Sequence, residues 1–192
     1  MLQSQLAIIA QGQSYLEKVA LVDYVEIVSP NFISSAGSHI RHIIDHYLAL
    51  ISGINNGLID YDVRHRGNNV ESCPQLAITQ FEEISSWVSE LSNEYLATEV
   101  TLSTEISITT KSIKKVKTSI ARELIFSGSH AIHHYSMIAQ ICFAQNMPLP
   151  PLFGVAPATL TYLREHKETQ CKKSFSKHVP LKTDIKQTIS QS

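Results

Sequence analysis

The sequence predicts an all-α protein, a bundle of four long helices with a small β hairpin insertion and a short C-terminal helix. Three observations support this prediction. Apolar residues recur at intervals of three and four in four long segments, as expected of helices that bury one face. Proline residues or an Asn-Asn-Gly run end several of these segments. Residues 99–109, in contrast, alternate between apolar and polar types with many β-branched side chains, which is typical of strands.

The first two helices have recognisable ends. We expect the first over residues 2–28, ended by a Ser-Pro pair. The second helix begins after Ser34 or Ser35, since either hydroxyl can cap its first turn. It runs to about Ile54, and Asn55-Asn56-Gly57 ends it. Apolar residues occupy a wide arc of this helix, so we expect it to be buried on most sides.

The second half of the bundle surrounds the predicted hairpin. A third helix is expected over residues 73–97, with a proline suited to its first turn. The alternating segment 99–109 then predicts a small hairpin or two short extended pieces. A fourth helix begins after Thr118 or Ser119, which can cap it, and ends near Asn146, ahead of a proline-rich stretch.

We expect one domain and a tail. The chain of 192 residues is long enough for one domain with a real core and short for two. Residues 1–168 are predicted to form the bundle domain, including a short final helix over residues 157–167. Residues 169–192 are rich in Lys, Ser and Thr and poor in apolar residues, so we expect a polar, flexible C-terminal tail.

Composition excludes several classes of protein. A net charge of −1 gives no basic surface for nucleic acid, and we interpret the lysines at 111, 114, 115 and 117 as a solvated edge. The apolar runs are far shorter than the ~18 residues that a membrane-spanning helix requires. Three separated cysteines and an N-terminus without a secretion signal fit a reducing compartment, so we expect a cytoplasmic protein.

The nine histidines are unevenly distributed. Six of them fall in two short helical windows, at positions 39, 42 and 46 and at positions 130, 133 and 134. His130 and His134 are four residues apart and share the apolar face of the fourth helix. An i, i+4 pair lets two imidazoles bind one metal ion, and a third imidazole from the second helix would complete a three-histidine site. The alternative is a set of buried structural histidines that bond to carbonyls or carboxylates.

Three segments carry a resemblance to a known family. They are Ser35-Ala36-Gly37-Ser38-His39-Ile40-Arg41-His42-Ile43-Ile44-Asp45-His46-Tyr47, Tyr61-Asp62-Val63-Arg64-His65-Arg66-Gly67, and the stretch from Arg122 to Tyr135. They resemble the DinB/YfiT-like superfamily over roughly residues 5–165. The resemblance implies a four-helix bundle, often dimeric, with a divalent metal held by three histidines. One ligand comes from the second helix and two come from an H-x-x-x-H pair.

By position in these motifs, the implied ligands are His42, His130 and His134, with His39 and His46 as competitors of His42. The metal would be Zn, Ni, Fe or Mn, because imidazole ligands disfavour Mg and Ca. The chain has Tyr135-Ser136-Met137 where the family often has Gly-Gln, which indicates a divergent branch. The superfamily is associated with hydrolysis and with thiol-dependent transfer.

Two hypotheses about function follow. The first is a metal-dependent hydrolase or thiol S-transferase acting on an unknown small molecule. In it, Glu123 is the candidate general base or partner of a metal ligand, and Arg64, Arg66 and Asp62 are candidates for binding an anionic substrate. The alternative for Glu123 is a charge that favours the start of a helix. The alternative for the two arginines and the aspartate is that they belong to a solvated loop. The second hypothesis is a non-catalytic homodimeric bundle that binds a small molecule or a protein partner.

Overall fold

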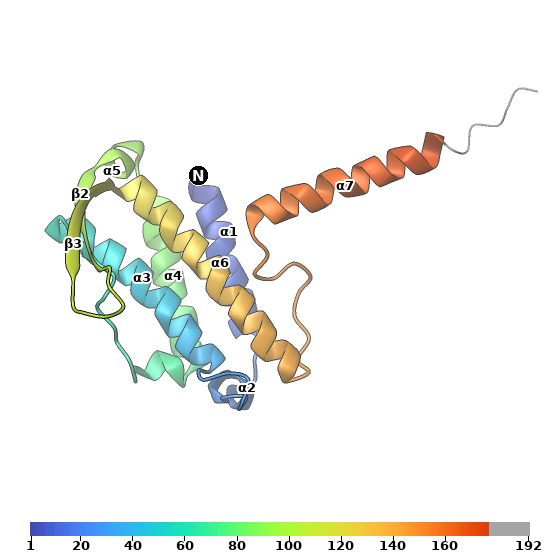
Figure 1. The fold of residues 1–192 in the computed structure, drawn as a ribbon, viewed down its shortest axis with the longest axis horizontal. Coiled ribbons are helices and arrows are strands. Elements are labelled where there is room, and N and C mark those ends of the chain that lie inside the picture. The colour runs from blue at the N-terminus through green and yellow to red at the C-terminus, as the bar shows by residue number, and fades with distance from the viewer. Residues whose placement is uncertain (177–192) are drawn as a thin grey trace, which may run out of the picture. The chain divides into compact units, whose positions relative to one another are not determined.

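The computed structural model describes the backbone of residues 1–176 and the side chains of residues 1–166 (Figure 1). The chain divides into two compact units, Met1–Ala156 and the part that begins at Pro157. The second unit contains helix α7, Pro157–Ser176. The predicted short helix therefore continues past residue 167, into the segment expected to be a tail. The rest of that predicted tail, residues 177–192, lies outside the described residues.

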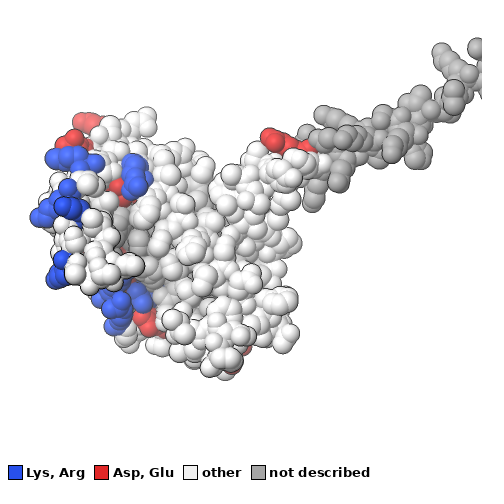
Figure 2. All heavy atoms as spheres, in the orientation of Figure 1, with Lys and Arg blue, Asp and Glu red and all other residues white. Residues whose placement is uncertain are grey.

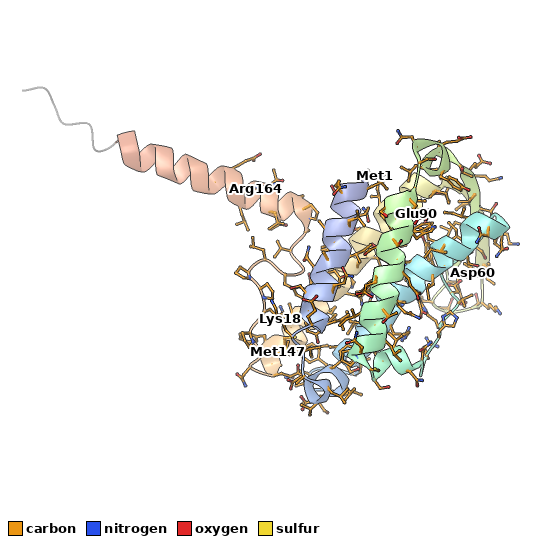
Figure 3. All side chains as sticks on the ribbon, turned by 180° about the vertical axis from the view of Figure 1, so that it is seen from behind. Met1, Lys18, Asp60, Glu90, Met147 and Arg164 are labelled. Atoms are coloured by element: carbon orange, nitrogen blue, oxygen red, sulfur yellow. The ribbon has the colours of Figure 1, made fainter. Side chains whose placement is uncertain are left out.

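The first unit is a closed bundle of four helices, as predicted. These are α1 (Leu2–Leu16), α3 (Ala36–Asn56), α4 (Pro74–Glu90) and α6 (Ile120–Ala144). Each of the four packs against two others: α1 against α4 and α6, and α3 against α6 and α4. Figure 3, from behind, shows α1 and α4 side by side. No helix within residues 1–176 is long and apolar enough to cross a membrane.

One hydrophobic core fills the bundle. Isoleucine, leucine and valine side chains from all four helices are buried in it, together with four fully buried tyrosines: Tyr15, Tyr24, Tyr47 and Tyr135. Helix α3 is buried around most of its circumference, which confirms the expectation from its wide apolar arc. A helix that is surrounded in this way holds its polar side chains away from water, which matters for its three histidines.

The caps of the two central helices match the sequence signals. Ser35 caps α3 by accepting a hydrogen bond from the backbone N–H of Ser38, and Gly57 ends it with a positive φ of 69°. Ser119 caps α6 by accepting a bond from the N–H of Arg122. Side-chain oxygens satisfy amide donors that the helix leaves free, and glycine adopts the left-handed conformation without strain.

Two helices predicted as continuous are broken. The segment 2–28 forms α1 and the short α2 (Leu21–Val25), and the segment 73–97 forms α4 and the short α5 (Asn93–Ala97). Neither break has a proline, so local propensity did not reveal it. The first break lets the chain turn over the end of the bundle, where Tyr24 is fully buried and its hydroxyl donates to the Val70 carbonyl at 2.7 Å.

The β insertion has three strands. Strands β2 (Glu99–Glu105) and β3 (Ile113–Ser119) form an antiparallel hairpin, which confirms a small β hairpin insertion. Only the first strand lies within the predicted segment 99–109, and the second lies in residues 113–119, which include three of the lysines. Strand β1 (Leu58–Asp60), which the sequence analysis missed, pairs in parallel with β2. β3 is an edge strand, and its exposed lysines help form the basic area on the sheet side in Figure 2. This fits the interpretation of a solvated edge.

Candidate metal centre

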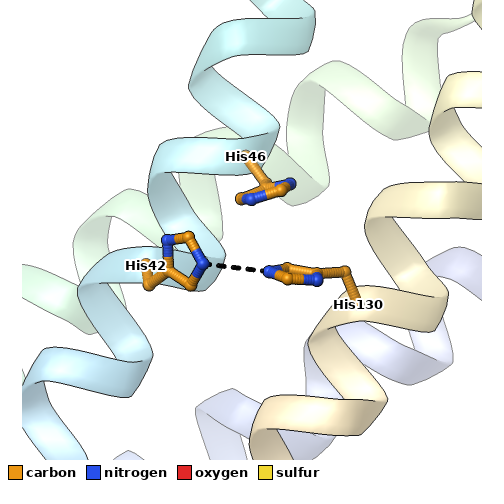
Figure 4. A group of neighbouring side chains, drawn as sticks. All are labelled: His42, His46 and His130. Atoms are coloured by element: carbon orange, nitrogen blue, oxygen red, sulfur yellow. Dashed lines mark hydrogen bonds between the residues drawn. The ribbon is translucent and has the colours of Figure 1, made fainter. Parts of the chain in front are cut away.

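Five imidazoles meet where α3 packs along α6. His39, His42 and His46 lie at intervals of three and four on α3, and His130 and His134 lie one turn apart on α6. Residues at these intervals share a helix face, so each helix presents its histidines to the other. Figure 4 shows His42 and His46 from α3 and His130 from α6 directed into one space. The tertiary structure therefore joins the two histidine windows of the sequence.

Three ring nitrogens converge at the centre of the cluster. Nε2 of His130 lies 3.0 Å from Nε2 of His42 and 3.1 Å from Nε2 of His134. Two imidazoles that share one cation, with bonds of about 2.0–2.1 Å, place their nitrogens about 2.9–3.4 Å apart. Each of these two pairs therefore has the spacing of two ligands of one cation. The same distances fit N–H···N hydrogen bonds equally well, so hydrogen bonds connect these three rings in the metal-free chain.

His46 offers a further nitrogen at this centre. Its buried ring is stacked between Tyr61 and His130, with centroid distances of 4.7 and 3.9 Å. Neither ring nitrogen of His46 has a hydrogen-bond partner among the described residues. A buried polar group without a partner costs free energy, which a bound ligand would offset. The ring nitrogens of His42, His46 and His130 lie within 4.8 Å of one another, so these three residues could hold a metal ion.

His39 lies one step outside the centre. Its Nδ1 is 2.7 Å from Nδ1 of His134, and its Nε2 is 3.0 Å from Oγ of Ser34. Both nitrogens are engaged away from His42 and His130, so His39 orients His134. Of the two competitors of His42, the structure places His46 at the centre and His39 behind it. The ligand set His42, His130 and His134 stays a prediction.

One arrangement of protons gives every hydrogen bond between Arg64, His39 and His130 a donor. Arg64 donates to Nδ1 of His42 at 2.7 Å, so a neutral His42 carries its proton on Nε2 and donates to Nε2 of His130. On the other side, His39 donates to His134 and His134 donates to His130. Both series of donors end on Nε2 of His130. A cation would therefore bind the lone pair of His130 Nε2 in place of the N–H groups of His42 and His134.

Burial keeps the cluster neutral at neutral pH. Desolvation, with additional repulsion from neighbouring imidazoles, lowers the pKa of four histidines: His42 to about 3, His46 to about 3, His130 to about 4 and His134 to about 2. Arg64 adds repulsion at His42, His46 and His130. Burial also lowers the pKa of His39. Neutral imidazole is the form that binds metal ions, so the fold prepares these side chains as ligands.

Glu123 is fully buried near the cluster but does not bond to it. Its carboxylate accepts hydrogen bonds from Tyr61 Oη at 2.9 Å, from Thr118 Oγ1 at 2.7 Å and from Arg122 at 2.8 Å. Tyr61 in turn stacks on His46. The geometry therefore gives Glu123 a positioning role through Tyr61, and the general-base role stays a prediction.

Two of the three candidate substrate-binding residues lie at one cavity, and the third lies elsewhere. Arg64 and Arg66 line a cavity of about 260 Å³ whose wall also contains His39, His42 and His134. Asp62 is directed elsewhere, because its carboxylate accepts a hydrogen bond from the backbone N–H of Glu105 at 2.6 Å. The loop that contains these residues therefore contributes Arg64 and Arg66 to the cavity, whereas its Asp62 binds the backbone of strand β2.

Sequence reasoning missed the network that fixes this loop. Arg41, which is buried, donates to Glu71 at 2.7 Å and to Asp45 at 3.0 Å. Asp45 also accepts a bond from Nδ1 of His65 at 2.7 Å. The i, i+4 spacing of Arg41 and Asp45 was the available signal. The ion pairs attach the loop to α3, so that Arg64 reaches His42.

Comparisons with known proteins support the fold. The solved structure of YjoA, a DinB-like protein from Bacillus subtilis, has a TM-score of 0.57 to this chain at 17% identity. The match covers 79% of this chain and 96% of that one, so the fold is that of a DinB-like protein and the resemblance seen in the sequence is supported. No protein-family model matches the chain.

A sequence relative covers part of the chain. Over 108 residues, the chain is 32% identical to FK506-binding protein 5 of the fungus Rhizopus delemar. The match covers 56% of this chain and 28% of that protein, so this chain corresponds to about a quarter of its relative. The similarity is therefore to one segment of a longer protein.

Proposed function

We propose that this chain, which has a DinB-like fold, binds one divalent cation and uses it in hydrolysis or in thiol-dependent transfer. The proposed ligands are His42, His130 and His134, and the cation is Zn, Ni, Fe or Mn. The observation that carries the proposal is the position of Nε2 of His130, which lies 3.0 Å from Nε2 of His42 and 3.1 Å from Nε2 of His134. Imidazoles at this spacing suit the shared coordination of one ion.

The donor set fits such a cation in charge as well as in spacing. The imidazoles are neutral at neutral pH because burial lowers their pKa, so they do not repel a cation as imidazolium groups would. A bound divalent metal supplies Lewis acidity, which lowers the pKa of a water or thiol ligand and provides a nucleophile near neutral pH.

The surrounding residues keep this centre ordered and partly dry. Tyr61 and Phe126 cover the cluster beside His46, with ring centroids 4.7 and 5.9 Å from its ring. His39 holds His134 through Nδ1. The cavity beside His42 and His134 is the route by which a substrate reaches the centre. An accessible cavity next to neutral imidazoles favours a catalytic site over a closed structural one.

Metal content per chain tests the proposal. We would express the protein without a histidine tag, incubate it with Zn, Ni, Fe or Mn, remove excess metal and measure the bound metal by plasma mass spectrometry. About one equivalent is expected for the wild type, and less than about a tenth of that for His130→Ala, since loss of one of three ligands costs orders of magnitude in affinity. The exposed His133 provides the matched control, His133→Ala, on the same helix.

Further substitutions identify the ligands. His42→Ala and His134→Ala should lose the metal, whereas His39→Ala should keep it with weaker affinity, because His39 touches only His134 within the centre. If His46→Ala loses the metal and His134→Ala retains it, the ligands are instead His42, His46 and His130. A wild type that takes up none of the four metals would refute the proposal.

A second function is favoured by the hydrogen bonds among the imidazoles. The network from Arg64 through His42 to His130 is complete without a cation, as a structural cluster requires. In this case the protein is a non-catalytic bundle that binds a small molecule or a partner. The absence of metal uptake, together with a folded, stable protein, would support it. Cytoplasmic localisation and a homodimeric state stay predictions, and light scattering after gel filtration would test the second.

A further inference from the structure

The cavity beside the histidine cluster is positively charged. Among the residues that line it, three are arginines, Arg41, Arg64 and Arg66, and none is Asp or Glu. The side of the cavity nearest the cluster is formed by neutral imidazoles, which add no negative charge. A concave surface with one sign of charge concentrates ligands of the opposite sign.

The three arginines are not equivalent. Arg41 is neutralised by Glu71 at 2.7 Å and by Asp45 at 3.0 Å, so it holds the loop in place. Arg64 and Arg66 form no ion pair with any residue within 1–166. Arg64 is half-buried and donates to Nδ1 of His42, an uncharged acceptor. A partly buried guanidinium gains far more from an anion than from a neutral imidazole.

Two serine hydroxyls complete the polar wall. Ser34 Oγ lies 3.0 Å from Nε2 of His39, and Ser38 Oγ donates to Glu71 at 3.4 Å. Both sit at the start of α3, on the same side as the arginines' loop. Each hydroxyl has one proton, which Ser38 gives to Glu71 and Ser34 gives to the acceptor nitrogen of His39, so the guanidinium groups are the donors that an anion would meet.

We propose that this cavity binds the oxyanion of a small substrate, a carboxylate or a phosphate, through Arg64 and Arg66. The inference rests on the proposed function, because the bound anion would place the rest of the substrate against His42 and His134 at the metal centre. The planar fork of arginine matches two oxygens of either anion. The cavity volume of 260 Å³ equals about nine water molecules at ~30 Å³ each, so the occupant is a small molecule.

Arg64 also links the anion site to the metal centre. An imidazole that gives Nε2 to a cation carries its only proton on Nδ1, and Nδ1 of His42 then no longer accepts from Arg64. The guanidinium is released and donates into the cavity instead. The anion should therefore bind more tightly to the metal-loaded chain than to the metal-free chain, and part of that gain should depend on Arg64.

Calorimetric titration with inorganic phosphate and with succinate, at fixed ionic strength, tests the inference. Each anion is titrated into metal-free protein and into protein loaded with the metal that it retains. Arg64→Gln and Arg66→Gln should each weaken binding about tenfold or more, the usual loss for a charge-assisted hydrogen bond. Arg64→Lys should be intermediate, because it keeps the charge without the fork. Lys114→Gln, an exposed lysine on β3, is the control with the same charge loss.

The outcomes separate the two proposals. Preference for phosphate or for succinate identifies which oxyanion the substrate carries. Affinity that is unchanged in both Arg→Gln variants would overturn the anion site, even if metal content stays at one equivalent. Arginine-dependent binding to a chain that takes up no metal would refute the metal centre and support the anion site. If Arg64→Gln does not fold, as judged by circular dichroism, Arg66→Gln and Arg64→Lys still decide the question.

Discussion

Acidification should destabilise the metal-free protein strongly. Four histidines of the cluster have pKa values of about 2 to 4 in the folded chain, whereas histidine in an unfolded chain titrates near 6.5. Between those values the unfolded chain binds more protons than the folded chain does. The free energy of unfolding therefore falls as the pH drops through 6.5, and it recovers as the pH rises.

The magnitude follows from proton linkage. Lowering the pH from 7 to 5 removes about 2 kcal/mol for each histidine that is protonated only in the unfolded chain. Four such residues give a loss of about 8 kcal/mol. The loss is about 4 kcal/mol if two of the four histidines are also protonated in the folded chain. Typical domains have a total stability of about 5–15 kcal/mol, so the protein should approach its unfolding transition at pH 5.

Urea unfolding followed by circular dichroism, at pH 7 and pH 5 with a chelator present, measures this loss. His46→Phe removes one buried titrating ring and should reduce the loss by about 2 kcal/mol. His166→Gln, which removes an exposed histidine of α7 outside the cluster, is the control for loss of a histidine. Equal unfolding free energies at the two pH values would refute the argument that burial holds the cluster neutral.

Two further predictions concern the scaffold. Gly37→Ala should destabilise the protein by about 1–3 kcal/mol in urea unfolding, because the added Cβ would overlap the backbone carbonyl of Glu71. Gly128→Ala is its control and should cost less, since the atoms nearest its Cβ belong to the side-chain amide of Gln5 and not to the backbone. Glu123→Gln should cost about 1–3 kcal/mol by disturbing the three hydrogen bonds of a buried carboxylate while metal content stays unchanged. Wild-type stability of Glu123→Gln would contradict this positioning role.

The bundle could be predicted from sequence where local signals and burial agree. Helix α3 has a serine cap, a glycine stop and a wide apolar arc, and its observed ends match those signals within about two residues. The breaks after Leu16 and Glu90 were missed, because a chain without proline bends there to satisfy packing elsewhere. Strand β1 was missed as well, since three residues carry no periodic signal and its pairing partner begins 41 residues later.

The sequence predicted the residues of the site better than it predicted the contacts between them. Helical spacing alone indicates that His130 and His134 share a face, and the clustering of histidines points to α3 as their partner. Spacing did not show that His46 lacks hydrogen-bond partners or that Arg64 reaches His42. These contacts depend on the loop that the ion pairs of Arg41 hold against α3. No rule of local sequence relates residues so far apart.

The sequence by itself determined the helical architecture, the small β insertion and the histidine-bearing faces of α3 and α6. These follow from periodicity, caps and turn residues, which act over a few neighbouring positions. Only the tertiary structure decided which nitrogen atoms meet, which imidazole lies behind another, and which arginines form no ion pair with a carboxylate of residues 1–166. Distance, burial and dielectric environment arise when separate segments pack together, and they set the protonation of the cluster and the charge of its cavity.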